Sequence, residues 1–310
     1  MTSWDPAALE CLAAIVEEGG FERAAVRLHI TQSAVSQRLR TLEAQIGSVL
    51  VQRTRPVKPT SAGRLLLKHA KQLRLLRADL ARELQELAPQ TGQSLAGETI
   101  SIAINADSIA TWAMEALDGL VRDGLPLEVV VDDQDFTQEL LRSGQVMGCV
   151  TTLSQALRGC AVQPLGAMRY VAVASAGFAR ERLPEGLTRS NCNRLPYLSF
   201  NRKDDMQAEF VARCLGLRSV SLRQQILLPS CEAQLRAVRA GWGVGVLPEL
   251  QVRPALEAGD LVDVAPGHAL AIDLYWHCWN LDSRVLERVS RALLRTARVL
   301  LAQPGRVEGE

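Results

Sequence analysis

The stretch from Phe21 to Leu42, FERAAVRLHITQSAVSQRLRTL, constrains the fold of this chain more than any other. Its first part places four apolar residues on one face of a short helix: Phe21, Ala24, Ala25 and Leu28. The pattern breaks at His29, and Thr31 is a good N-cap residue because its hydroxyl can accept from the amides of the next turn. A second helix then follows, with a buried face made of Val35, Leu39, Leu42 and Ile46. The sequence therefore predicts two short helices joined by a tight turn.

The second predicted helix carries a polar face opposite its apolar one. Small serine side chains would let this helix approach a groove closely, while Gln can bond adenine and Arg can bond guanine or phosphate. We therefore expect this face to enter the major groove of DNA, with contacts from Thr31, Gln32, Ser33, Ser36, Gln37 and Arg38. The pattern by itself fits a solvated helix pair in an all-α domain equally well.

A basic segment follows the helix pair. The run VLVQRTRPVKPTSAG after Gly47 is strand-like, with Arg53, Arg55 and Lys58 set among prolines. Such a segment is typical of a wing that lies on the phosphate backbone. A new helix is expected to start at Thr60.

These motifs together resemble a known family. The segment AAVRLHITQSAVSQRLRTLEAQIGSVLVQRTRPVKPTSAG resembles the N-terminal winged helix–turn–helix of the LysR-type transcriptional regulators, and the likeness runs from Trp4 to Leu87. The motifs HITQSAVSQR and RTRPVKPTSAG are similar to those of the arginine/lysine-responsive subgroup of that family, ArgP, LysG and IciA. One departure is Val51, which stands where most wings of the family carry an aromatic residue.

Length and charge agree with a two-part chain. The 310 residues are enough for two or three domains, and the net charge of +1 argues against a wholly basic DNA-coating protein. The charge is unevenly placed, since residues 1–90 carry 13 Lys/Arg against 9 Asp/Glu and the remainder is mildly acidic. This distribution fits a DNA-binding head on a sensing domain.

Other sequence features argue against several classes of protein. The start lacks a signal region and no apolar run reaches the roughly 18 residues of a membrane span, so we expect a cytoplasmic protein without membrane contact. The seven cysteines are scattered without a CxxC pair, which favours idle thiols over a redox pair or a metal site. No HExxH, GxSxG or Walker sequence is present, so we expect no enzyme, no metal and no cofactor.

A long helix is expected after the wing, over residues 61–88. Leucines recur in it every seven residues, with Leu76 between them: Leu66, Leu73, Leu80 and Leu87. A heptad seam needs a partner, and a second copy of the same helix would make a dimer; packing against the chain's own body is the alternative. Dimerisation would place two recognition helices on successive turns of one DNA duplex.

The remainder of the chain alternates between strands and helices. Residues 1–60 are predicted to form the winged helix–turn–helix and 89–98 a hinge, after which the pattern indicates α/β domains with largely parallel sheets. The order resembles the effector-binding region of the LysR type, which is like a periplasmic binding protein. The resemblance implies one subdomain of residues 97–164 and 269–303, a second of residues 165–268, and a ligand between them.

Candidate effector-binding residues stand at the predicted strand ends. Asn105, Asp107 and Ser108 end the first strand and open a helix whose amides could hold a carboxylate. Thr151 and Thr152 end another strand. Acidic residues follow two further strands and would pair with a cationic ligand tail: Asp132, Asp133 and Asp204. Each of these acids fits a helix cap or a solvated surface equally well.

The resemblance independently implies L-lysine or L-arginine as the effector. The expected protein is a DNA-binding regulator of amino-acid export or metabolism genes, a homodimer or a dimer of dimers, with promoter DNA and RNA polymerase as partners. Two alternatives remain open: a ligand-independent DNA-binding protein that inhibits replication initiation, and a regulator that senses redox state through two of its cysteines.

Overall fold

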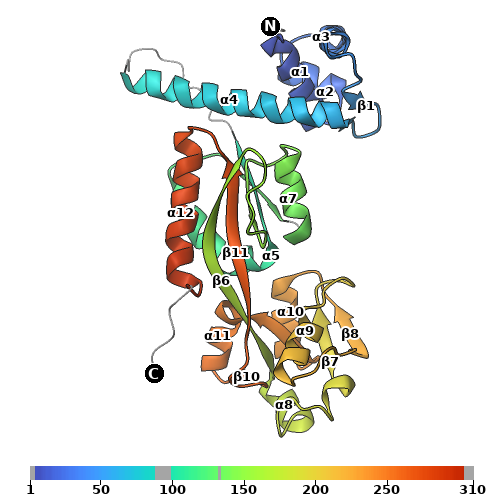
Figure 1. Ribbon diagram of the computed structural model, residues 1–310, viewed down its shortest axis with the longest axis vertical. Helices are drawn as coiled ribbons and strands as arrows, with labels where there is room; N and C mark the ends of the chain where they lie inside the picture. The colour runs from blue at the N-terminus through green and yellow to red at the C-terminus, as the bar shows by residue number, and fades with distance from the viewer. Residues whose placement is uncertain (1–3, 88–98, 132–133, 304–310) are drawn as a thin grey trace.

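The N-terminal part of the chain is a small helical domain with a two-stranded wing. The computed structural model describes residues 4–87, 99–131 and 134–303, except for the side chains of residues 85–87 and 134–137. The domain contains α1 (Pro6–Glu17), α2 (Phe21–Arg27), α3 (Gln32–Ile46), β1 (Val51–Gln52) and β2 (Lys58–Pro59), and is followed by the long helix α4 (Ser61–Leu87) (Figure 1).

Apolar burial and capping explain these elements. The carboxylate of Asp5 accepts from the Ala7 amide at 2.9 Å and starts α1, which then buries seven residues. The core of the domain joins α1, α2 and α3 to the wing residue Val51 and the first turns of α4. Gly63 is required where α4 meets the wing, because a Cβ there would lie 1.9 Å from the carbonyl oxygen of Leu50.

The predicted leucine seam of α4 divides between two environments. Leu66 is buried and Leu73 is half-buried, and both pack on the core of the N-terminal domain. Leu76 and Leu80 are exposed, as are Leu84, one turn after Leu80, and Leu65 near the start of the helix. The side chain of Leu87 lies outside the described residues. The apolar face that a second copy could cover is therefore formed by Leu76, Leu80 and Leu84.

The C-terminal part is built on one mixed sheet. Its strand order is β4-β3-β5-β11-β6-β9-β7-β8, with β10 paired to β6. The bounds are β3 (Ile100–Ile104), β4 (Leu127–Val131), β5 (Gly148–Thr151), β6 (Cys160–Ser175), β7 (Pro196–Ser199), β8 (Gln224–Leu227), β9 (Val244–Pro248), β10 (Leu261–Asp263) and β11 (Leu270–Trp279). The α/β prediction is confirmed, but the largely parallel sheet is only partly right.

The long strands β6 and β11 explain that difference. They pair antiparallel from Cys160 to Tyr170 of β6, and the end of β6 pairs antiparallel to β9 and β10. Parallel pairs remain within each half, β4-β3-β5 in the first and β8-β7-β9 in the second. The two long strands run from one half into the other, so each half is a subdomain and the connection is a continuous sheet (Figure 1).

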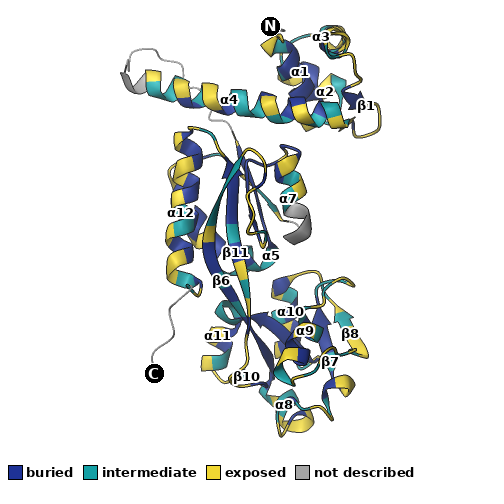
Figure 2. Cartoon of the chain, in the orientation of Figure 1, coloured by how far each residue is buried: buried dark blue, intermediate teal, exposed yellow. Residues whose placement is uncertain are grey.

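Helices cover the sheet on both sides. They are α5 (Ala106–Ser108), the π-helical turn η1 (Ile109–Ala113), α6 (Met114–Arg122), α7 (Gln134–Arg142), α8 (Ala176–Arg182), the 3-10 turn η2 (Cys192–Arg194), α9 (Met206–Cys214), α10 (Cys231–Arg239), α11 (Glu249–Glu257) and α12 (Arg284–Leu300). Buried residues follow the long strands through both subdomains (Figure 2), and the largest buried side chains include Trp112, Trp276 and Trp279.

The thiols form no disulfide bonds. All seven cysteines are free, and burial raises the pKa of Cys149 to about 12. In the part of the chain that the structure describes, no group of three or more His, Cys, Asp or Glu residues is placed to hold a metal ion. None of the described helices is both long and apolar enough to span a membrane.

Candidate functional site

The helix pair predicted from the sequence is present in the N-terminal domain. The turn between α2 and α3 contains His29 in the left-handed region, with φ of 54°. Thr31 caps α3, since its Oγ1 accepts from the Ala34 amide at 3.2 Å and lies 2.9 Å from the Ser33 hydroxyl. The opposite face of α3 is anchored in the core by Val35, Leu39 and Leu42. The cap and the core together fix which face of α3 is presented outward.

The outward face of α3 holds most of the predicted DNA-binding residues. Thr31, Gln32, Ser33 and Gln37 are exposed, and Ser36 is half-buried on the same face. Arg38 is also exposed, but its guanidinium interacts with the thiol of Cys11 in α1. Arg38 therefore lies towards the edge of α3, between the groove-facing side and the core.

The wing brings the predicted basic residues beside the helix pair. Strands β1 and β2 pair antiparallel, with Val51 opposite Pro59 and Gln52 opposite Lys58. Arg53, Arg55 and Lys58 are all exposed. Arg53 also stacks over the ring of Phe21 in α2 at 5.7 Å, which ties the wing to the helix pair. Val51 is buried in the core and packs without the aromatic residue typical of other wings.

A second polar constellation lies where the two subdomains meet. Asp107 in α5 is half-buried, and each oxygen of its carboxylate accepts one hydrogen bond. The hydroxyl of Tyr170 on β6 donates to Oδ2 at 2.7 Å, and the thiol of Cys231, the first residue of α10, donates to Oδ1 at 2.9 Å. The first subdomain is thereby bonded to a long strand and to a helix of the second.

Burial sets the protonation of this cluster. The pKa of Asp107 is raised by burial first of all, although the bonds from Cys231 and Tyr170 oppose the rise. Burial, and then the neighbouring carboxylate, raise the pKa values of both Tyr170 and Cys231. Both groups therefore stay protonated and serve as donors to Asp107 at neutral pH.

Several buried oxygens around this cluster have no hydrogen-bond partner among the described residues. They are Asn105 Oδ1 and Ser108 Oγ in the first subdomain and Ser199 Oγ and Gln207 Oε1 in the second. All four side chains are at most 3% exposed. Because an unpaired buried polar atom is costly, such a set indicates a place for a ligand that supplies donors.

The other predicted effector residues differ in their placement. Thr151 ends β5 and is buried, and β5 pairs parallel to β3, so Thr151 lies near Asn105 at the same edge of the sheet. Thr152 is exposed. Asp204 shapes a turn by accepting from the amides of Phe200 and Met206, at 2.7 Å and 3.1 Å, and its charge also acts on Asp107. Asp132 and Asp133 lie outside the described residues.

Sequence reasoning missed four residues of this constellation: Tyr170, Ser199, Gln207 and Cys231. Ser199 ends β7 and could have been found by the rule that identified Thr151. Cys231 opens α10, but a lone cysteine carries no sequence signal for ligand binding. Tyr170 and Gln207 lie inside a strand and a helix, and only the fold brings them to Asp107 and Asp204.

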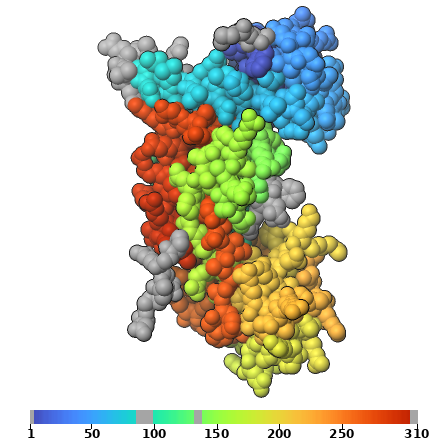
Figure 3. Space-filling model, viewed as in Figure 1, coloured from blue at the N-terminus to red at the C-terminus, as the bar shows by residue number. Residues whose placement is uncertain are grey.

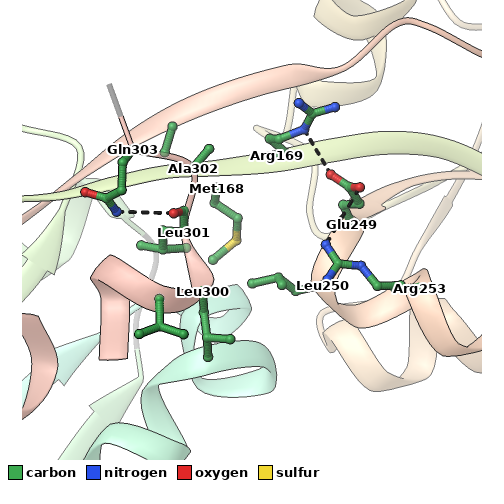
Figure 4. Close-up of a pocket in the computed structure, with 11 residues that line it drawn as sticks. Met168, Arg169, Glu249, Leu250, Arg253, Leu300, Leu301, Ala302 and Gln303 are labelled. Atoms are coloured by element: carbon green, nitrogen blue, oxygen red, sulfur yellow. Dashed lines mark hydrogen bonds and ion pairs between the residues drawn. The ribbon is translucent and has the colours of Figure 1, made fainter. Parts of the chain in front are cut away.

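A separate cavity lies elsewhere in the effector domain. It has a volume of about 510 Å³ and is lined by the end of α12, by α11 and by β6 (Figure 4). Its charged groups already pair, because Glu249 lies 2.9 Å from Arg169 and 3.8 Å from Arg253. Arg169 and Tyr170 are consecutive on β6 and so point to opposite faces of the sheet. This cavity is therefore separate from the constellation around Asp107.

The two sites define a class of protein. A winged helix–turn–helix with a polar outward helix and a basic wing is a DNA-binding module, and the two-subdomain α/β unit carries a second, ligand-type site. Family models match both parts. Residues 6–64 match the bacterial regulatory helix–turn–helix protein of the lysR family, and residues 93–299 match the LysR substrate binding domain. The chain belongs to the LysR family of transcriptional regulators, and its predicted non-enzymatic role is confirmed.

Named relatives are similar over nearly the full length. The transcriptional regulator ArgP of Aeromonas salmonicida is 40% identical over 98% of this chain and 100% of its own length. LysG of Mycobacterium tuberculosis is 42% identical over 91% of this chain and 90% of its own. The predicted resemblance to the ArgP and LysG subgroup is therefore confirmed.

Solved structures agree with the fold. A crystal structure of ArgP from Mycobacterium tuberculosis has a TM-score of 0.85 at 40% identity and covers 97% of this chain and 100% of its own. Full-length LysG from Corynebacterium glutamicum with bound effector Arg has a TM-score of 0.74 at 35% identity, covering 96% and 99%. The fold-class prediction is confirmed by these structures.

Proposed function

We propose that this regulator binds promoter DNA through α3 and the wing and binds L-arginine or L-lysine at the Asp107 constellation. One observation carries the effector assignment: a half-buried carboxylate lies beside four buried oxygens that have no donor among the described residues. LysG from Corynebacterium glutamicum has been solved with bound effector Arg, which supports the same ligand class. Control of genes for amino-acid export or metabolism would follow from such an effector.

The chemistry of the site favours a cation with several donors. An ammonium has three N–H donors and a guanidinium has five, whereas a neutral side chain such as that of leucine has none. Asp107 would pair with the side-chain cation, and the oxygens of Asn105, Ser108, Ser199 and Gln207 would accept its remaining hydrogens. The ligand's carboxylate would bind the first amides of α5, which no side chain caps, and the hydroxyls of Thr151 and Thr152.

Calorimetric titration with arginine, lysine, ornithine and leucine tests this assignment. We expect saturable binding of the basic amino acids alone. Asp107→Asn should weaken it by at least tenfold, since losing one partner of a buried charge pair costs about 2–5 kcal/mol. Asp205→Asn is the matched control, because Asp205 is exposed at the start of α9 and makes no capping bond. Equal binding of leucine, or an unaffected Asp107→Asn variant, would contradict the assignment.

We also propose how the other sites contribute. The contacts to DNA would come from Thr31, Gln32, Ser33, Ser36 and Gln37 on α3, with Arg38 at its edge and the wing residues Arg53, Arg55 and Lys58 on phosphates. The exposed Leu76, Leu80 and Leu84 of α4 would form the dimer seam, and two dimers would form a tetramer that engages RNA polymerase in the cytoplasm. The subdomain boundaries near residues 164 and 269 belong to the same proposal.

The redox alternative has less support from the structure. The pKa values of five cysteines besides Cys149 are raised, mainly by burial: Cys11, Cys160, Cys214, Cys231 and Cys278. Because the thiolate is the reactive form, such thiols react slowly. Loss of DNA binding on mild oxidation, absent from a Cys→Ser variant, would restore that alternative. DNA binding unchanged by any amino acid would favour a ligand-independent regulator.

A further inference from the structure

The linker helix α4 carries a buried acid that neither DNA binding nor dimerisation explains. Asp79 lies among the leucines of α4 and is only 6% exposed. Its Oδ2 accepts from the hydroxyl of Ser283 at 2.5 Å, and its Oδ1 accepts from Arg82 at 3.1 Å. Ser283 belongs to the effector domain and is the N-cap of α12. The acid therefore bonds the linker helix to the N-cap residue of a helix in the effector domain.

The direction of this hydrogen bond is fixed by its partners. Ser283 Oγ accepts from the Leu286 amide at 3.3 Å, as an N-cap does, and a carboxylate can only accept. The serine proton must therefore go to Asp79. One hydroxyl thus holds the start of α12 and the middle of α4 at the same time, and Ser283 is itself only 5% exposed.

Further contacts extend the same face of α4. Leu75, one turn before Asp79, is fully buried in the core of the effector domain. Glu83, one turn after it, pairs with Arg284 at 3.1 Å. Lys71, one turn before Leu75, donates to the carbonyl of Gln145 at 3.2 Å. In the space-filling view, α4 lies directly on the beginning of α12 (Figure 3).

A neighbouring face of α4 is bonded to the DNA-binding domain. Arg74 contacts Glu10 of α1 at 2.7 Å and Glu17 at 3.2 Å. Lys71 lies 3.8 Å from Glu17 as well, so it touches both domains. The helix is therefore attached to α1 on one side and to the effector domain on another, while Leu76, Leu80 and Leu84 stay open.

The path continues from α12 to the effector constellation. Helix α12 packs against α6 and η1, and η1 follows directly on α5, which holds Asp107. The buried Ser290 of α12 also accepts from the indole of Trp276 on the long strand β11 at 2.9 Å. A contiguous set of packed elements thus joins Asp107 to α4.

We propose that Asp79 is a positioning residue that, through Ser283, docks α4 on α12 and so transmits the effector state to the DNA-binding domains. This inference rests on the proposed function for the identity of the signal. Movement of α5 and η1 on effector binding shifts α12. The Asp79–Ser283 bond carries that shift to α4 and to the DNA-binding domain attached to it. The docking itself is a separate, measurable property of the chain.

Three variants test the proposal in the full-length protein. Asp79→Ala removes the acceptor and leaves the α12 cap intact, and Ser283→Ala removes the donor together with the cap. Ser175→Ala is the matched control, because Ser175 caps α8 through the Phe178 amide at the same distance of 3.3 Å but lies in the second subdomain. The double variant of Asp79 and Ser283 completes a mutant cycle.

The readout compares DNA affinity with and without saturating arginine, using a duplex selected in vitro from random-sequence DNA. We expect Asp79→Ala and Ser283→Ala to bind arginine within about twofold of the parent in calorimetry. Their arginine-dependent change in DNA affinity should fall to near onefold, and the double variant should lose no more than either single one. Ser175→Ala should keep the full change. A full arginine effect in Asp79→Ala would overturn the proposal.

Hydrogen exchange separates this proposal from the effector assignment. Whatever the ligand, Asp79→Ala should speed exchange at least tenfold in the middle of α4 and in the first turn of α12, and Ser175→Ala should not. If the parent protein binds no basic amino acid, the effector assignment fails and exchange still decides the docking. Unchanged exchange in Asp79→Ala would refute the docking even if arginine binds.

Discussion

Gly144 offers a direct test of the contact between α4 and the effector domain. It ends the turn after α7, with φ of 72°, and lies against α4. A Cβ at this position would lie 2.6 Å from Lys68 Cβ and 2.7 Å from Lys68 Cα. Since carbon atoms in contact are about 3.5–4.0 Å apart, Gly144→Ala requires the backbone of α4 or of the turn to move by about 1 Å.

The magnitude follows from two contributions. A left-handed conformation costs a residue with a Cβ about 1–2 kcal/mol, and overpacking against backbone adds about 1–3 kcal/mol. Gly159→Ala isolates the first contribution, because Gly159 has φ of 76° and no atom within 4 Å of the added Cβ. Replacing glycine by alanine also lowers the conformational entropy of the unfolded chain, which stabilises the folded state. This contribution is the same for both variants and cancels in their comparison.

Thermal unfolding and hydrogen exchange measure the difference. We expect Gly144→Ala to unfold at a lower temperature than Gly159→Ala, by about 2–4 °C for each kcal/mol in a domain of this size. If α4 moves away instead, the melting temperatures will agree more closely and exchange in α4 will rise in Gly144→Ala alone. Identical melting temperatures and identical exchange in α4 would refute the close approach of Gly144 to Lys68.

Three further predictions concern the other sites. Arg55→Ala and Lys58→Ala should each weaken binding to all DNA sequences and reduce the slope of log affinity against log salt concentration by about 0.9. Gln37→Ala should instead reduce the binding free energy by about 1–3 kcal/mol at the preferred site only. Fluorescence anisotropy measures both effects. Burial raises the pKa of Asp107, so arginine binding should be present above that pKa and should be lost as the pH falls through it. The loss should occur at a higher pH than for an ordinary carboxyl group. Calorimetry at several pH values checks this, and Asp107→Asn should remove the pH dependence. Leu80→Glu should shift the protein towards monomer in sedimentation velocity, while Arg77→Glu, at an exposed position on the same helix, should not.

The N-terminal domain could be predicted from sequence because its signals are local. Thr31 caps the helix that it was expected to cap, and Val35, Leu39 and Leu42 form the buried face that their spacing indicates. The leucines of α4 show the limit of such signals. A heptad pattern does not say which leucines the chain's own domains will cover, and here the N-terminal core takes Leu66 and Leu73.

The effector site was only partly predictable because its members come from distant segments. Asn105, Ser108 and Thr151 follow from the rule that ligand groups stand at strand ends, and all three are buried at one sheet edge. Asp107 was expected at the effector site, but its hydrogen-bond partners Tyr170 and Cys231 lie 63 and 124 residues away in the chain. No local pattern reports a contact of that separation.

Asp79 shows how an exception to a pattern can identify an interface. A linker helix that served only to dimerise would be at least as stable with an apolar residue at this buried position, because replacing a buried ion by a hydrophobic residue is often neutral or stabilising. A carboxylate there favours one arrangement over others, since Arg82 lies on α4 itself and only the docked arrangement adds the donor Ser283. A displaced α4 would leave a buried charge without its partner, so the acid gives the linker and the effector domain a single docked geometry.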